Sequence, residues 1–158
     1  MSPSDDAVPG GSGREEASEP SDVGCVFCAI VAGQAPAHRV LDEDAAVAFL
    51  DTRPLFPGHV LLVPRPHVET LGDLPAELVE PLFAAARRLS VAVERGLGAQ
   101  GSFVAVNNRV SQSVPHLHVH VVPRRKGDGL KGFFWPRSPY ASDEQAAEVA
   151  ARIRGALL

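Results

Sequence analysis

The sequence predicts an α+β fold with a mainly antiparallel sheet, one long helix and a C-terminal helix. Several short apolar runs bounded by turn residues are typical of strands. Apolar residues recur at helical spacing through residues 74–97. Strands and helices do not alternate regularly, as a parallel βαβ arrangement would require. With 158 residues and 45% apolar side chains, the chain can bury one core, so we expect a single folded domain over residues 23–158.

The first half of the domain contains a short helix and three strands. The stretch "CVFCAIVAGQAP" has the apolar spacing of a short helix that ends at Gly33. Strands are expected at 38–41 and 46–51, separated by the acidic turn "DED". After the loop "RPLFPG", the apolar strand "HVLLVP" must stop at Pro64.

The second half begins with the long helix, Leu74–Leu97, for which Asp73 is the expected N-cap and Gly98 the stop. The stretches "SFVAVN" and "HLHVHVVP" predict an antiparallel hairpin joined by the polar loop "NRVSQS". Residues 124–140, which include "GFFWP", have no clear period and are expected to form a loop. A capping box at Ser142 and Gln145 then predicts a helix to the C-terminus.

The charge distribution separates the first 22 residues from the rest. They hold six of the 19 acidic residues, one of the 15 basic residues and almost no large apolar side chain, which predicts a disordered acidic tail. The remaining part has a net charge near +1, too low for binding duplex nucleic acid. The sequence shows no signal peptide and no apolar run of membrane-spanning length, so we expect a cytoplasmic protein without a membrane partner.

Three histidines alternate with apolar residues in the stretch "PHLHVHVVPR" at 115–124. In a strand, His116, His118 and His120 would share one face. Imidazole is a nucleophile near neutral pH that can attack phosphorus. The hydroxyl and N–H groups of the preceding "SQSV" suit phosphate oxygens. The alternative is a half-buried strand that uses histidine as its polar residue.

The two cysteines, Cys25 and Cys28, form a CxxC pair with three interpretations: core thiols, a redox pair or half of a zinc site. A redox pair normally lies between a strand and a helix N-terminus, whereas this pair precedes an apolar helix with no strand before it. Structural zinc needs four ligands of the Cys and His type. The spacing favours zinc over free thiols and leaves the other two ligands to be found.

The string His116–Val122 resembles the signature of the histidine-triad superfamily, in which the second histidine becomes nucleotidylated. Two further stretches strengthen the resemblance. "AFLDTRPLFPGHVLLVPRPHVETLGDL" at 48–74 is similar to the region that holds the ribose and backs the nucleophile, and "VNNRVSQSVPH" at 106–116 to the phosphate loop. The resemblance covers about residues 24–125.

The resemblance implies a role for each matching residue. His118 is the nucleophile, His120 bonds a phosphate oxygen or the leaving group, and His59 supports the active imidazole. The implied nucleotide contacts are Asp51 for the ribose, Asn107, Gln112 and Ser113 for the phosphate, and Val26, Phe27, Ile30 and Phe49 for the base. Without the resemblance, Phe27 and Phe49 would be assigned to core packing and Asp51 to a turn.

The resemblance also implies a complete structural zinc site, formed by Cys25, Cys28, His67 and His116. Four protein ligands leave no open position, so the metal would orient the site without touching substrate. One residue departs from the family pattern. Ser111 replaces a glycine that usually precedes "QS", and its Cβ could crowd the approach of phosphate.

The implied function is hydrolysis or transfer of a nucleotidyl group through a nucleotidyl-His118 intermediate. Substrates would be nucleoside phosphoramidates, dinucleoside polyphosphates or related mixed anhydrides. One alternative is a purine-nucleotide sensor with negligible turnover, and another is a hydrolase whose three triad histidines bind a catalytic metal. The resemblance further implies a homodimer formed through the long helix and the neighbouring strand.

Overall fold

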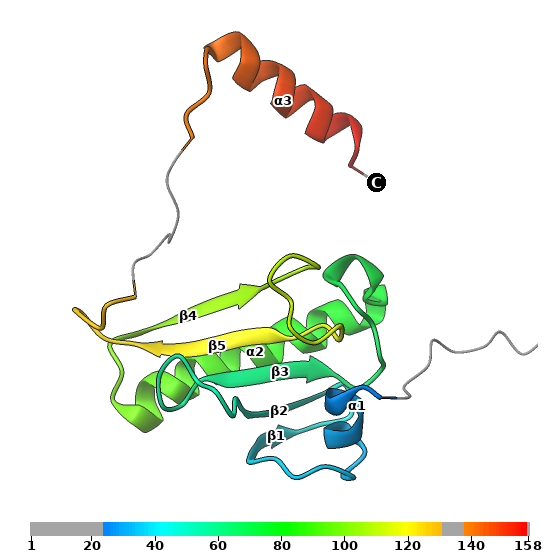
Figure 1. Ribbon diagram of the computed structural model, residues 1–158, viewed down its shortest axis with the longest axis vertical. Helices are drawn as coiled ribbons and strands as arrows, with labels where there is room; N and C mark the ends of the chain where they lie inside the picture. The colour runs from blue at the N-terminus through cyan, green and yellow to red at the C-terminus, as the bar shows by residue number, and fades with distance from the viewer. Residues whose placement is uncertain (1–23, 131–137, 158) are drawn as a thin grey trace, which may run out of the picture. The chain divides into compact units, whose positions relative to one another are not determined.

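The computed structural model describes residues 24–130 and 138–157, and it confirms the α+β class (Figure 1). Its elements are α1 (Val26–Val31), β1 (Arg39–Asp42), β2 (Ala46–Leu50), β3 (Val60–Pro64), the 3-10 helix η1 (Leu71–Asp73), α2 (Ala76–Leu97), β4 (Gly101–Val106), β5 (Val119–Arg124) and α3 (Asp143–Gly155). The first four predicted strands lie within one residue of these bounds. Turn residues and prolines therefore marked the strand ends correctly.

The five described strands form one antiparallel sheet in the order β1-β2-β3-β5-β4. β5 pairs with both β3 and β4, so it lies inside the sheet. His120 faces Leu61 of β3 in the register and Ala105 of β4. This central position places the end of the histidine motif among the least exposed strands of the fold.

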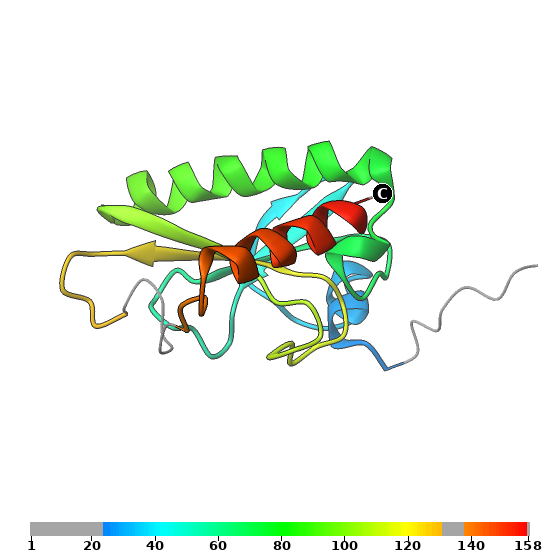
Figure 2. The same ribbon diagram turned by 90° about the horizontal axis from the view of Figure 1, so that it is seen from above.

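Helices lie on opposite faces of the sheet, with α2 along one face and α1 on the other (Figure 2). The face under α2 is covered by the helix's own apolar side chains, Leu82, Ala85, Ala86, Leu89 and Val93. Leu117, Val119 and Val121 belong to this core. Residues of the opposite parity in β2 and β3 instead form a second core with Phe27 and Ile30 of α1. The period-two pattern of the strands thus separates the two faces.

Two predicted boundaries are wrong. Asp73 does not cap α2, whose N-cap is Pro75. The Asp73 carboxylate instead accepts hydrogen bonds from the Thr70 N–H at 3.0 Å and the Thr70 hydroxyl at 2.6 Å, which closes η1. β5 begins at Val119, so His120 is the one triad histidine within the strand. The strand starts late because the Leu117 N–H donates to the Val68 carbonyl at 2.7 Å rather than to a strand ladder.

The described residues divide into two compact units, one ending at Lys126 and one beginning at Gly127. The second contains α3, where the Gln145 N–H donates to the Ser142 hydroxyl at 3.2 Å, as the capping box predicts. The predicted acidic tail and "GFFWP" lie outside the described residues. A single domain over 23–158 stays a prediction. Within the described ranges, no helix is long and apolar enough to cross a bilayer.

Candidate active site and metal-binding cluster

His118 is held in one tautomer by the backbone of its own motif. Its ring is 3% exposed, and Nδ1 lies 2.7 Å from the His116 carbonyl oxygen. Because a carbonyl only accepts hydrogen bonds, Nδ1 carries the proton and Nε2 of the neutral ring keeps its lone pair. The Phe27 ring meets the imidazole edge-on, with ring centroids 5.2 Å apart. His118 therefore has the protonation pattern that a nucleophile attacking through Nε2 requires.

His59 and His120 form a hydrogen-bonded pair beside this ring. The Leu55 N–H donates to His59 Nδ1 at 3.2 Å, so the proton of neutral His59 is on Nε2. His59 Nε2 lies 2.9 Å from His120 Nδ1 and donates to it. The proton of neutral His120 is then on Nε2. His120 and His118 have ring centroids 4.9 Å apart, which places a hydrogen-bond donor next to the nucleophile.

Burial keeps this histidine pair neutral at physiological pH. Desolvation is the main cause that lowers the pKa of His120 to about 4, and the charges of His118 and His59 act in the same direction. Burial also lowers the pKa of His59, where the Asp51 charge opposes the shift. The pair therefore acts near neutral pH as a donor of hydrogen bonds rather than as a cation.

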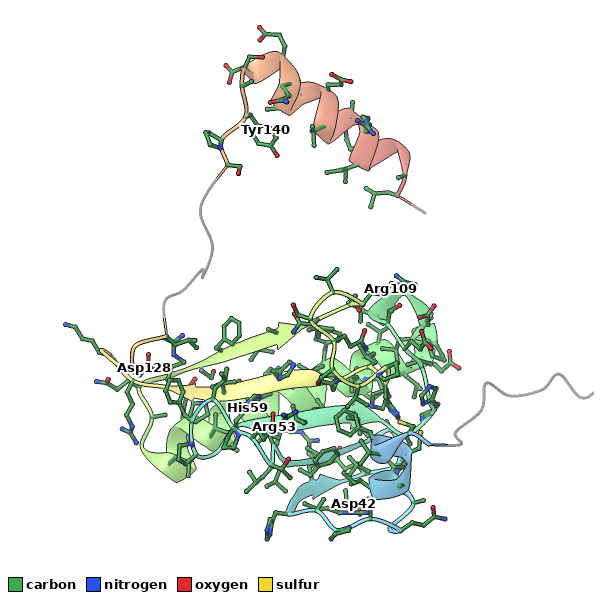
Figure 3. All side chains as sticks on the ribbon, viewed as in Figure 1. Asp42, Arg53, His59, Arg109, Asp128 and Tyr140 are labelled. Carbon is green, nitrogen blue, oxygen red and sulfur yellow. The ribbon has the colours of Figure 1, made fainter. Side chains whose placement is uncertain are left out.

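The sequence offered two alternatives for Asp51, a turn residue or a residue of the site. In the structure it forms a turn and also lies beside the site. Its Oδ1 accepts from the Arg53 N–H at 2.8 Å, a turn typical of aspartate, and its Oδ2 lies 3.6 Å from His59 Nδ1. Figure 3 labels Arg53 and His59, which lie near one another in this view. Asp51 thus lies behind the histidine pair, with its carboxylate partly exposed.

The predicted phosphate loop uses its amide side chains internally. Asn107 Nδ2 donates to the Ser111 carbonyl at 3.3 Å, while Gln112 bonds the Arg109 N–H and the Glu69 carbonyl. Ser113 is exposed, and its hydroxyl makes no hydrogen bond with the described residues. Of these three predicted contacts, Ser113 is the one whose polar group makes no hydrogen bond with the described residues, whereas the amides of Asn107 and Gln112 each keep one further N–H.

Three of the four predicted base contacts gather on the histidine face of the sheet. Phe27, Ile30 and Phe49 are buried in one cluster, and the two phenylalanine rings meet edge-on at 5.4 Å. Val26 is 49% exposed and lies outside that cluster. The packing interpretation of Phe27 and Phe49 therefore describes this structure, and the cluster adjoins the His118 ring through Phe27.

The four predicted zinc ligands come together. The candidate atoms of Cys25, Cys28, His67 and His116 all lie within 4.8 Å of one another. Cys28 Sγ is 3.2 Å from His67 Nδ1 and 3.4 Å from His116 Nδ1, and Cys25 Sγ is 3.5 Å from His116 Nδ1. A tetrahedron around zinc has sulfur-to-nitrogen edges of about 3.5 Å, given bonds of about 2.3 and 2.0 Å.

The tautomer of His116 also suits a metal ligand. Its Nε2 lies 2.9 Å from the Pro64 carbonyl, so Nε2 carries the proton and Nδ1 faces the cysteines with a lone pair. The residues therefore fit structural zinc. Among the described residues this is the one group of candidate ligands, and it contains a single triad histidine. The geometry does not favour the alternative in which all three triad histidines bind one metal.

Sequence reasoning missed the backbone groups that orient these rings. The Pro64 carbonyl, the Leu55 N–H and the His116 carbonyl each fix one imidazole tautomer. Every residue carries such groups, so no residue type could signal them. The unusual Ser111 was a signal for the loop, because its φ of 60° is a left-handed conformation that glycine adopts more easily.

The sheet topology and the alternating histidines define a class of protein, the histidine-triad fold. Comparisons with known proteins agree: the HIT domain family model matches residues 32–127. An uncharacterised HIT-like protein of Mycobacterium tuberculosis is 39% identical over 120 residues, covering 73% of this chain and 83% of that protein. The chain belongs to the HIT family.

Two further relatives carry informative names. Adenylylsulfatase HINT3 of Arabidopsis thaliana is 30% identical over 151 residues, which cover 91% of this chain and 74% of that protein. A crystal structure of a Zn-bound histidine triad family protein from Mycobacterium smegmatis is 38% identical, with a TM-score of 0.65. That match covers 85% of this chain and 98% of the solved chain. A named hydrolase and a zinc-bound structure are thus both similar to this chain.

Proposed function

We propose that the protein cleaves a nucleotide at its α-phosphate through a covalent nucleotidyl intermediate on His118. The hydrogen bond from His118 Nδ1 to the His116 carbonyl is the observation that carries the proposal, because it leaves Nε2 as the basic nitrogen. Family membership and the likeness to an adenylylsulfatase support a substrate that contains a nucleotidyl group.

The chemistry proceeds in two displacements. His118 Nε2 attacks the α-phosphorus, and the bond from phosphorus to the leaving group breaks; the leaving group keeps the electron pair, and an amine leaving group takes a proton from the solvent. The imidazole keeps its Nδ1 proton and becomes positively charged, which strengthens its hydrogen bond to the His116 carbonyl. Water then attacks the same phosphorus and releases one proton to the solvent, the bond from phosphorus to Nε2 breaks, and the nucleoside monophosphate departs. An alcohol or phosphate in place of water would give transfer.

The surrounding residues support these steps without taking a covalent part. Neutral His120, oriented by His59, donates from Nε2 to a phosphate oxygen or to the leaving group. Ser113 bonds a second phosphate oxygen. Asp51 accepts from the ribose hydroxyls, and the base lies against the cluster of Phe27, Ile30 and Phe49.

Zinc at the cluster formed by Cys25, Cys28, His67 and His116 would have a structural part. When bound, a four-coordinate zinc contributes rigidity and has no position for substrate. His116 is at once a ligand through Nδ1 and the acceptor for His118 through its carbonyl. The metal would therefore orient the nucleophile through one shared residue.

The test is the intact mass of the protein after mixing with adenosine phosphoramidate or adenylyl sulfate and quenching in base, where a phosphorus to histidine bond survives. We expect a mass increase of one adenylyl group in the wild type and none in His118→Ala. Turnover without any adduct, or an adduct that persists in His118→Ala, would contradict the nucleophile. Binding without turnover would favour the nucleotide sensor.

A further inference from the structure

We propose that Gln112 is a positioning residue for the phosphate loop rather than a ligand of the phosphate. The inference rests on the proposed function, since it concerns how the connection between β4 and β5 prepares the site. It differs from the contact that the sequence pattern implies for Gln112.

Two residues of this connection adopt a conformation that side chains disfavour. Arg109 has φ 66° and Ser111 has φ 60°, and they are the non-glycine residues with positive φ in the described chain. In the left-handed region Cβ crowds the following carbonyl oxygen, so such residues persist where their surroundings hold them. Val110, between them, is 81% exposed and contributes little packing. Hydrogen bonds must therefore supply most of the restraint.

Gln112 provides that restraint with both ends of its amide. Its Oε1 accepts from the Arg109 N–H at 2.7 Å, and its Nε2 donates to the Glu69 carbonyl at 2.6 Å. Asn107 Nδ2 holds the other strained residue by donating to the Ser111 carbonyl at 3.3 Å. These two bonds fix the plane of the amide, and the second N–H of Nε2 is the one donor that Gln112 still has for a phosphate.

These hydrogen bonds hold the loop against the segment that follows His67. Besides Glu69, the Leu71 N–H donates to Asn108 Oδ1 at 2.8 Å, and the Leu117 N–H donates to the Val68 carbonyl. Figure 3 shows Arg109 on the connection held by these bonds.

The same loop also contacts side chains on the histidine face of the sheet. Val114 packs against the cluster that contains Phe27 and Phe49, so the loop turns towards the histidines after Ser113. Gln112 directly precedes Ser113, so its two hydrogen bonds hold the chain next to the Ser113 hydroxyl.

Gln112 is proposed to act by holding a strained backbone conformation. Removing the strain at Arg109 and Ser111 should therefore restore the activity that is lost without Gln112. Glycine reaches positive φ as readily as negative φ, which removes the need for the restraint by Gln112. The test compares kcat/KM for adenosine phosphoramidate in wild type, Gln112→Ala, and Gln112→Ala combined with Arg109→Gly and Ser111→Gly. The same glycine pair in Ser113→Ala is the matched control.

We expect Gln112→Ala to lower kcat/KM by about tenfold, which corresponds to about 1.4 kcal/mol. The glycine pair should return it to within about threefold of wild type but should not rescue Ser113→Ala, whose missing group contacts substrate. Gln112→Glu, which keeps the acceptor and loses the donor, should fall between wild type and Gln112→Ala. A loss in Gln112→Ala without rescue would show a direct ligand, and no loss would show that the restraint by Gln112 is unnecessary. Either result overturns the proposal.

Amide hydrogen exchange separates this inference from the proposed function. The Arg109 N–H should exchange slowly in the wild type and at least tenfold faster in folded Gln112→Ala. If the wild type turns over no nucleotide, the proposed function fails. The exchange measurement still tests whether Gln112 holds the loop in place. Equal exchange in both proteins would overturn the inference.

Discussion

His116 belongs to two sites at once. Its side chain faces Cys25 and Cys28 through Nδ1, and its carbonyl accepts the proton of the His118 ring. The bond from its Nε2 to the Pro64 carbonyl fixes the ring between them. Replacing His116 should therefore impair metal binding and the nucleophile together, whereas each of its neighbours affects one of the two.

At the nucleophile, we expect His118→Ala to lower kcat by more than about a thousandfold while the Kd for a nucleoside monophosphate changes by less than about threefold. The methyl group removes the attacking nitrogen, and the ribose and base contacts remain. Single-turnover kinetics and isothermal titration calorimetry measure the two quantities. His38→Ala is the control, because His38 is exposed and outside both sites. A His118→Ala protein that retained wild-type turnover would contradict the assignment.

The low pKa of His120 makes stability depend on pH. Above pH 6.5 the residue is neutral in both folded and unfolded chains and does not make the free energy of unfolding depend on pH. Between pH 6.5 and about 4 the unfolded chain binds a proton that the folded chain does not, so the free energy of unfolding falls as pH falls. We expect a loss of about 1–2 kcal/mol across this window, after allowing for the partial exposure of the ring.

Urea unfolding at pH 7.5 and pH 4.5, with EDTA present so that metal release does not contribute, measures this loss. The variant His120→Asn removes the titrating ring and should show a smaller difference between the two pH values. The same pH dependence in both proteins would contradict the assignment of the effect to His120.

Residues of the candidate site could be predicted from the sequence where their role depends on the type of side chain. The alternating histidines, the cysteine pair and Asp51 have recognisable types and spacings, and the four predicted zinc ligands lie close together as expected. The tautomers were not readable, because backbone groups at Leu55 and Pro64 set them. The amide of Gln112 has the same chemistry whether it binds a phosphate or its own loop, so its partners needed coordinates.

Among the elements, we expect α1 to depend on the zinc that we propose for the cluster of Cys25, Cys28, His67 and His116. It has six residues, shorter than a helix needs to be stable alone, and Cys25 is its N-cap. We expect one zinc per chain by elemental analysis and a lower Tm after chelation, by about 5 °C or more. Cys28→Ser should lose both the metal and the response to chelator, whereas His38→Ala should keep them. A Tm that chelation does not move would contradict a structural metal here.

The loop before β3 depends on Gly58. It has φ 96°, and a Cβ there would lie 2.2 Å from Leu97 Cδ1. We expect Gly58→Ala to lower the free energy of unfolding by about 2 kcal/mol, and to reduce activity because the next residue is His59.

Gly96, inside α2 with open space around its Cα, offers the matched substitution to alanine. Gly96→Ala should raise the free energy of unfolding by about 0.5–1 kcal/mol, since alanine favours helix. Urea unfolding of the two variants measures both values. Equal effects of the two substitutions would contradict the steric argument.

Element type was easier to predict than element ends. The apolar spacing of α2 and the alternation of the strands survive in the structure because burial requires them. The start of α2 and the start of β5 were missed, since each depends on a competing local hydrogen bond. Asp73 bonds Thr70 instead of the helix, and Leu117 bonds Val68 instead of a neighbouring strand.

At the scale of the whole molecule, β1 and β4 are the outer strands of the sheet formed by the described residues. We propose that β4 and α2 form the interface of a homodimer, as family resemblance implies. Val104 on β4 is 45% exposed, and Val79 and Phe83 project from α2 one helical turn apart. Exposed apolar residues on and beside an edge strand are typical of an interface between chains.

Light scattering coupled to size-exclusion chromatography tests this interface. We expect the mass of two chains for the wild type and a shift towards one chain for Val104→Lys. Val40→Lys, on the opposite edge strand and 50% exposed, should leave the mass unchanged. A monomeric wild type, or equal effects of both lysines, would contradict the assignment.

The metal-binding cluster also has a consequence for the folding of the chain. Its ligands are far apart in sequence, with 39 residues from Cys28 to His67 and 88 from Cys28 to His116. An ion held there would act as a reversible cross-link that closes two large loops, and such closure reduces the number of shapes open to a denatured chain. Loss of the ion would then raise susceptibility to proteases, starting near α1, before the sheet itself came apart.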